Sequence, residues 1–281
     1  MLVDVGDTRL HVAERGRGDV ALVVLHGGPG LDHTMFGSWL DQLGDEGIRL
    51  LLVDERAQGR SDPAPPETWT LEHHAHDVDA LATALGLERY VVLGHSFGAF
   101  IALQHAVDFS GRPSGTIVSS GVPSERFLVH VDEQLAAFEP VDLREQVQSS
   151  WAREAHARTP EDVAALLADQ WPFHFADPRD PRIDELRAGM TGAVLSPDVL
   201  RAAANEGYGH IEVEDRLGDV AHPVLVLAGR HDRTCSVPAA EAIAAGIPDA
   251  RLVVFEHSGH MSFAEEPEAY RAAVRGFAAA L

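Results

Sequence analysis

A serine stands directly after an apolar run, with a glycine two residues before it and another two residues after it. The run VVLGHSFGA covers residues 91–99 and contains Ser96. Between a strand and a helix, such a tight turn lifts a serine hydroxyl above the edge of a sheet, and only small neighbours fit around it. The pattern G-x-S-x-G also occurs in plain turns in which a serine caps a helix. Ser96 is therefore a candidate nucleophile that needs support from other residues.

Two later apolar runs end in residues that would activate a serine. Asp232 follows the run VLVLAG, and His260 follows the run LVVFEHSG. Because a serine hydroxyl is a poor nucleophile at neutral pH, it needs an imidazole that takes its proton and a carboxylate that orients the imidazole. Serine, acid, histidine is a known chain order for such triads. We predict Ser96 as nucleophile, Asp232 as orienting acid and His260 as base, with His257 as the alternative base.

A glycine-rich turn, HGGPG at residues 26–30, follows the apolar run VALVVL. Attack on a carbonyl creates a negative oxygen, which preorganised backbone amides stabilise if no side chain blocks their approach. We expect the amide of Gly28 to supply one donor and the amide of Phe97 the other. The alternative interpretation is an ordinary Gly-Pro turn.

Along the sequence, strand-like apolar runs alternate with helical patterns, and these elements would position the candidate residues. We expect a hairpin over residues 1–13 and strands near 20–25, 50–53, 90–93, 116–118, 224–228 and 251–255. We expect helices over 71–85 and 267–281, and a further helix that opens at Ser96 and continues over 100–107. This alternation predicts an α/β fold with a mostly parallel sheet, whose ligands gather at the carboxyl ends of the strands. The reactive residues stand at those ends.

The middle of the chain has a different character. Apolar runs are absent between about residue 123 and residue 223, and amphipathic helical patterns are interrupted by prolines at 140, 160, 172, 178, 181 and 197. We predict a core domain made of residues 1–122 and 216–281, with a helical cap at 123–215.

Composition excludes several classes of function. The net charge of −22 argues against a nucleic-acid surface, and the single cysteine, Cys235, cannot form an internal disulfide. The sequence has neither a secretory signal pattern nor a long apolar span, so we expect a cytoplasmic protein without a membrane partner. Although His73, His76 and Asp77 have helical spacing, the apolar stripe of that helix predicts that its histidines mostly point outward. We therefore expect no metal and no cofactor.

Taken together, these motifs resemble those of α/β-hydrolases over essentially the whole chain. HGGPG is the more specific signal, and it resembles the proline iminopeptidase branch, serine aminopeptidases that remove N-terminal proline. DERAQGRSD at residues 54–62 is similar to a D-x-R-G-x-G-x-S stretch of these enzymes, with Ala57 in place of glycine. The resemblance implies an eight-stranded, mostly parallel sheet with helices on both faces and an inserted helical cap. It also implies the triad and oxyanion residues named above.

The substrate is less constrained, because His95 and Phe97 flank the serine where the branch commonly has glycine and tryptophan. An aminopeptidase must pair a substrate ammonium with a carboxylate, which relatives supply from the cap. Glu206 lies in a stretch similar to theirs and is our candidate; its alternative is a solvated carboxylate at a helix end. A set of aromatic residues is a candidate for apolar pocket walls, with ordinary core packing as the alternative for each: Phe36, Phe97, Trp151, Trp171 and Phe173.

The function favoured by the sequence is a serine hydrolase that forms an acyl-enzyme and releases N-terminal residues from small peptides or amides. A carboxylesterase or lactonase on the same machinery is the alternative, and paired cap carboxylates facing Ser96 would distinguish the two. A ligand-binding receptor that retains the triad is a third hypothesis. Haloalkane dehalogenases and epoxide hydrolases of this fold have aspartate at the nucleophile position, so Ser96 argues against both.

Overall fold

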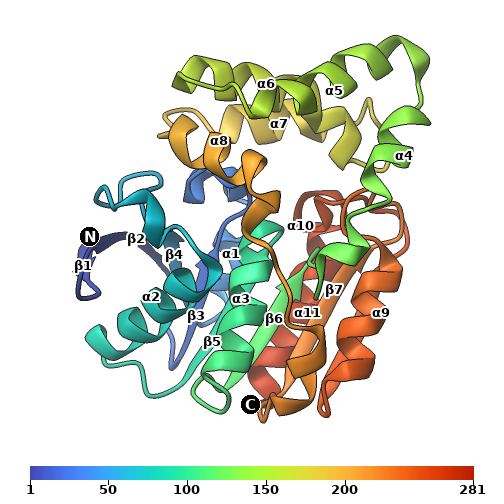
Figure 1. Cartoon of the computed structure of the whole chain (residues 1–281). Helices are drawn as coiled ribbons and strands as arrows, with labels where there is room; N and C mark the ends of the chain where they lie inside the picture. Colours follow the sequence, from blue (N-terminus) through green and yellow to red (C-terminus); the bar gives the residue numbers. More distant parts are fainter.

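The computed structural model describes residues 1–281, and its centre is a single sheet of eight strands (Figure 1). The strands lie in the order β1-β2-β4-β3-β5-β6-β7-β8. β2 pairs antiparallel with β1 and with β4, and all other neighbours are parallel. Their bounds are β1 Leu2–Asp4, β2 Arg9–Arg15, β3 Val20–Leu25, β4 Ile48–Asp54, β5 Tyr90–His95, β6 Gly115–Ser119, β7 Val224–Gly229 and β8 Ala250–Phe255. The predicted mostly parallel sheet is confirmed.

Two apolar layers cover the two faces of the sheet, because successive strand side chains point to opposite sides. Val23 and Val92 pack with α2 (Leu71–Ala84), α3 (Phe97–Asp108) and α9 (Val237–Gly246). Their neighbours Val24 and Leu93 pack on the other side with α1 (Asp41–Asp45), α10 (Ser262–Glu265) and α11 (Pro267–Ala280). The central strands are buried on both sides, which explains their unbroken apolar runs. None of the helices is both long and apolar enough to cross a membrane.

The helices between β6 and β7 form a separate layer above the carboxyl edge of the sheet (Figure 1). Their bounds are α4 Val131–Ala136, α5 Val141–Glu154, α6 Pro160–His174, α7 Arg182–Gly189 and α8 Pro197–Asn205. Pro160 and Pro197 occupy first-turn positions, where a missing N–H costs no hydrogen bond. The domain boundaries at 123 and 215 stay a prediction.

One predicted helix break is wrong. Pro172 lies inside α6 rather than at its end. The helix continues only to His174, so proline removes a bond near the last turn, and Thr159 stabilises the opposite end through a capping box with Asp162.

Ala57 occupies a left-handed backbone conformation in the turn after β4, with φ of 59°. An L-residue with a side chain pays about 1–2 kcal/mol there, whereas glycine does not. We expect Ala57→Gly to raise the free energy of unfolding by up to about 1 kcal/mol, because relief of strain exceeds the added entropy of the unfolded chain. Chemical denaturation measures this change.

The control is Ala272→Gly, at an exposed position within α11. There, glycine should lower the free energy of unfolding by about 1 kcal/mol. A loss of similar size in both variants would contradict the strain at Ala57.

Candidate active site

Ser96 lies on the sharp turn between β5 and α3. Its backbone has φ of 56° and ψ of −118°, a strained conformation for a residue with a side chain. The turn is possible because of its glycines: a Cβ on Gly94 would lie 2.0 Å from the carbonyl oxygen of Gly98. A Cβ on Gly98 would lie 2.5 Å from the carbonyl oxygens of His26 and Leu25. The G-x-S-x-G pattern thus satisfies a steric requirement at the end of two adjacent strands.

Asp232 and His260 follow β7 and β8, and the structure brings their side chains together. His260 Nδ1 lies 2.8 Å from Asp232 Oδ2. Asp232 Oδ1 accepts hydrogen bonds of 2.9 Å from the amides of Thr234 and Cys235 and from the Thr234 hydroxyl. Burial by itself raises the pKa of Asp232, but the charge and hydrogen bond of His260 and these amides outweigh it, so the pKa is lowered. The acid is therefore held ionised beside the imidazole.

The alternative base, His257, is exposed, whereas His260 is buried and lines the same cavity as Ser96. The imidazole of His260 also lies between two others, with ring centroids 5.0 Å from His95 and 5.0 Å from His174. Burial lowers the pKa of His174 to about 3, with the charge of His260 as a smaller cause. The pKa of His95 is lowered for the same two reasons. Both neighbours are neutral near pH 7, so neither competes with His260 for Asp232.

The predicted oxyanion donors lie at the same place. A Cβ on Gly27 would come within 3.1 Å of the Ser96 Cβ, so the HGGPG turn touches the serine. Gly28 and Phe97 both line the cavity, and neither amide donates a hydrogen bond within the protein. Two unpaired N–H groups beside a serine are suited to bind a developing negative oxygen.

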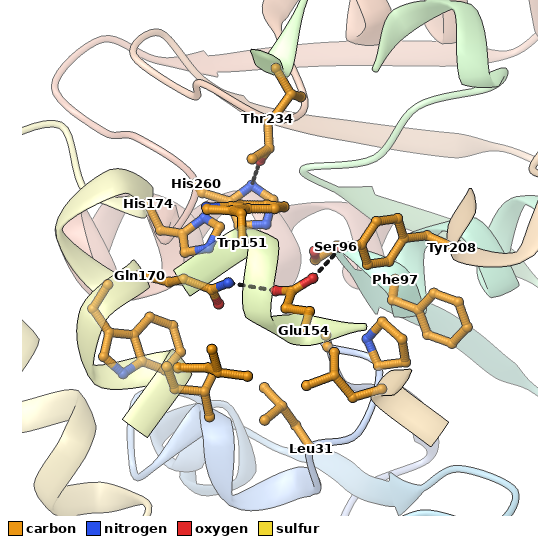
Figure 2. Close-up of a pocket in the computed structure, with 18 of the residues that line it drawn as sticks. Leu31, Ser96, Phe97, Trp151, Glu154, Gln170, His174, Tyr208, Thr234 and His260 are labelled. Atoms are coloured by element: carbon orange, nitrogen blue, oxygen red, sulfur yellow. Dashed lines mark hydrogen bonds between the residues drawn. The ribbon is translucent and has the colours of Figure 1, made fainter. Parts of the chain in front are cut away.

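A cavity of about 550 Å³ lies between the sheet edge and the cap, and Ser96 and His260 are on its floor (Figure 2). Its walls are mainly apolar and come from both layers. Three of the five predicted aromatic residues line it, Phe97, Trp151 and Trp171, while Phe36 and Phe173 are buried in the adjoining apolar clusters.

The carboxylate inside this cavity is Glu154, at the end of α5 (Figure 2). Its side chain accepts hydrogen bonds from the Gln170 amide and the Tyr208 hydroxyl, and no cationic side chain pairs with it. Burial raises the pKa of Glu154, and these two hydrogen bonds lower it by less. The sequence analysis did not select Glu154. Its spacing of three residues from Trp151 on α5 is the sequence signal that would have pointed to it.

Glu206, the carboxylate predicted to bind substrate, does not fit this geometry. It is exposed, caps the carboxyl end of α8 and is not among the residues that line the cavity. Its neighbour Tyr208 enters the cavity instead and reaches Glu154. The sequence stretch was therefore the relevant one, but a different residue of it faces inward.

Two groups of side chains are close enough to share an ion. One is Asp232, Cys235 and His260, in which the carboxylate and imidazole already bond each other. The other is His11, His33 and Asp54, where Asp54 accepts from the amides of His33 and Arg60. The Arg60 guanidinium lies 3.9 Å from that carboxylate and already supplies a positive charge.

The histidines of α2 differ from the prediction in one respect. His76 is exposed, but His74 is buried against the Phe97 ring, with centroids 5.8 Å apart. Asp77 is also buried and pairs with Arg56 at 2.6 Å. The helix turns a polar strip inward because Arg56 compensates the carboxylate.

Comparison with known proteins identifies the family of the chain. The family model described as alpha/beta hydrolase fold matches residues 20–267. The chain belongs to the α/β-hydrolase family. It is 27% identical over 264 residues to the proline iminopeptidase of Saccharolobus solfataricus, covering 91% of this chain and 84% of that protein. The chain is a hydrolase, and its similarity to the proline iminopeptidase branch is confirmed.

Solved structures with similar folds include enzymes of more than one specificity. The proline iminopeptidase of Mycobacterium smegmatis superposes with a TM-score of 0.76 at 27% identity, over 99% of this chain and 97% of that one. A thermophilic esterase from Thermogutta terrifontis superposes with a TM-score of 0.73 at 25% identity, over 99% and 97%.

Because the serine turn has no room for a Cβ at Gly94, we expect one added methyl group there to destabilise the protein severely. Gly94→Ala places a Cβ against the Gly98 carbonyl, so we expect a loss of about 3 kcal/mol or more in the free energy of unfolding. Gly276→Ala is the matched control, since Gly276 is at an exposed position of α11 where a Cβ would meet nothing within 4 Å, and this variant should gain up to about 1 kcal/mol. Equal stability of the two variants in denaturant titrations would refute the requirement.

Proposed function

We propose that this hydrolase is a serine aminopeptidase, acting through Ser96, His260 and Asp232, that releases N-terminal residues from small peptides or amides. His260 accepts the proton of the Ser96 hydroxyl as the oxygen attacks the scissile carbonyl. The amides of Gly28 and Phe97 stabilise the oxyanion. His260 then protonates the leaving amine, which departs and leaves an acyl-enzyme, and a water activated by the same imidazole hydrolyses the acyl-enzyme.

The observation that carries the amine preference is Glu154. It is 5% exposed, lies in the same cavity as Ser96 and has no cationic partner in the chain. Each of its oxygens accepts one hydrogen bond and keeps a further acceptor site. A substrate ammonium would supply the missing charge, and the pair would be desolvated together, which makes a charge-assisted hydrogen bond strong. The similarity to proline iminopeptidases supports the same assignment.

A carboxylesterase or lactonase is the second candidate. The cavity contains one buried carboxylate rather than a facing pair, since the other carboxylate that lines it, Asp132, is exposed. The rest of the wall is mainly apolar, which suits an uncharged acyl group, and an esterase is among the similar structures.

The nucleophile assignment predicts that Ser96→Ala lowers kcat on a chromogenic acetate ester at least about 1,000-fold, because no other group forms the acyl-enzyme. Ser149→Ala, at an exposed cap position, is the matched control and should retain full activity. Turnover by Ser96→Ala above a tenth of the parent rate would refute the assignment.

The amine assignment predicts that Glu154→Gln lowers kcat/KM on a prolyl anilide about 10- to 100-fold, since an amide replaces a charged acceptor worth about 1.5–3 kcal/mol. The same variant should change kcat/KM on the acetate ester by less than about threefold. Glu161→Gln, exposed at the start of α6, is the control. Equal losses on both substrates would exclude an amine site at Glu154. If the parent enzyme does not hydrolyse prolyl anilide but hydrolyses butyrate esters, the aminopeptidase assignment is wrong and the esterase assignment takes its place.

A further inference from the structure

The last turn of α6 and the residues after it, 173–176, contact the loops that carry the acid and the base. These four residues are called the α6 exit below. The same helix supplies Gln170, Trp171 and His174 to the cavity wall. The side chains of α6 therefore face the cavity, and the backbone at its carboxyl end contacts the loops that carry Asp232 and His260.

Arg233, the neighbour of Asp232, binds the α6 exit through three carbonyl oxygens. Its Nη1 donates to Phe173 at 2.9 Å and to Phe175 at 2.6 Å, and its Nη2 donates to Ala176 at 3.3 Å. The guanidinium has no carboxylate within ion-pair distance and lies over the Phe138 ring, 5.2 Å from its centroid. A cation at the carbonyl end of a helix is favourable, because unpaired carbonyls collect there.

Glu265 binds the α6 exit from the side of the base. Its Oε1 accepts from the Ala176 amide at 2.8 Å, and its Oε2 accepts from the Gly259 amide at 2.8 Å. Glu265 is 5% exposed, so water does not replace these bonds readily. One carboxylate thus joins the cap to the residue that precedes His260.

The base itself completes the contact. The His260 amide donates to the His174 carbonyl at 2.7 Å, and the two imidazoles pack with centroids 5.0 Å apart. The approach is so close that a Cβ on Gly259 would lie 2.6 Å from the same carbonyl oxygen. The position of His260 relative to Asp232 therefore depends on where the cap backbone lies.

We propose that Arg233 and Glu265 are positioning residues that hold the α6 exit against the acid and base loops, so that the docked cap aligns His260 with Asp232. This inference rests on the proposed roles of Asp232 and His260 as acid and base. It goes further by assigning a function to cap backbone and to two side chains that do not face Ser96. A small displacement of a reacting group can cost about 100-fold in rate, so the alignment is a sensitive target.

The test compares Arg233→Gln, Arg233→Lys and Glu265→Gln with two matched controls. Arg230→Gln and Glu256→Gln remove an exposed arginine and glutamate of the same two loops, which pair with each other at 2.7 Å. With a chromogenic acetate ester, we expect kcat to fall about 10- to 100-fold in Arg233→Gln and Glu265→Gln, while KM changes by less than about threefold. Arg233→Lys, which keeps the charge but not the planar fork, should lose kcat to an intermediate extent. The controls should stay within twofold of the parent.

A second readout does not depend on Ser96. The Nδ1 proton that His260 shares with Asp232 gives a low-field proton NMR signal, identified by its loss in His260→Gln. We expect this signal in the parent and both controls, and its weakening or loss in Arg233→Gln and Glu265→Gln. If kcat and the signal are unchanged in both of these variants, the proposal is overturned. If Ser96→Ala stays active, the nucleophile assignment fails, and the NMR signal still decides whether the α6 exit aligns the pair. A raised KM with normal kcat and a normal signal would assign the α6 exit to substrate binding and overturn the alignment role.

Discussion

Direct backbone contact at the carboxyl edge of the sheet is the constraint on which the site depends. At Gly98, the serine turn touches the end of β3, where no Cβ would fit. At Gly229, the end of β7 touches the loop that carries the base, and a Cβ there would lie 1.9 Å from the Gly259 carbonyl oxygen. Parallel strands already bring their carboxyl ends to one edge, and these glycines reduce the remaining separation to van der Waals contact. The nucleophile, the oxyanion donors, the acid and the base then fit into one small volume.

The cap buries this edge of the sheet and so changes the pKa values of the groups around the cavity. It covers the cavity, and burial raises the pKa of Glu154 while it lowers the pKa of His174. Both shifts have one cause, since a low dielectric disfavours the charged form of either group. Asp232 shows the opposite outcome in the same surroundings, because His260 and two backbone amides stabilise its charge. The direction in which the pKa of each carboxyl group shifts is thus decided by the charges and hydrogen-bond donors around it.

The same helix contacts both the substrate cavity and the loops of the triad. α6 presents Gln170 and Trp171 to the cavity, and its carbonyl end rests on Arg233. A fold whose cap is inserted between β6 and β7 can vary the cap for new substrates. The contacts at the α6 exit limit that freedom, because changes there would also move His260.

The sequence by itself determined the sheet, the triad candidates and the oxyanion turn. The central strands have continuous apolar runs because they are buried on both faces, and glycine, serine, aspartate and histidine stand within five residues of strand ends. These signals are local and are therefore readable from spacing. The choice of Glu154 over Glu206 was decided only by the tertiary structure, because the packing of α5 against α6 and α8 sets which carboxylate is buried. The same holds for Pro172 inside α6 and for Arg233 at its end, since both depend on contacts between segments far apart in the chain.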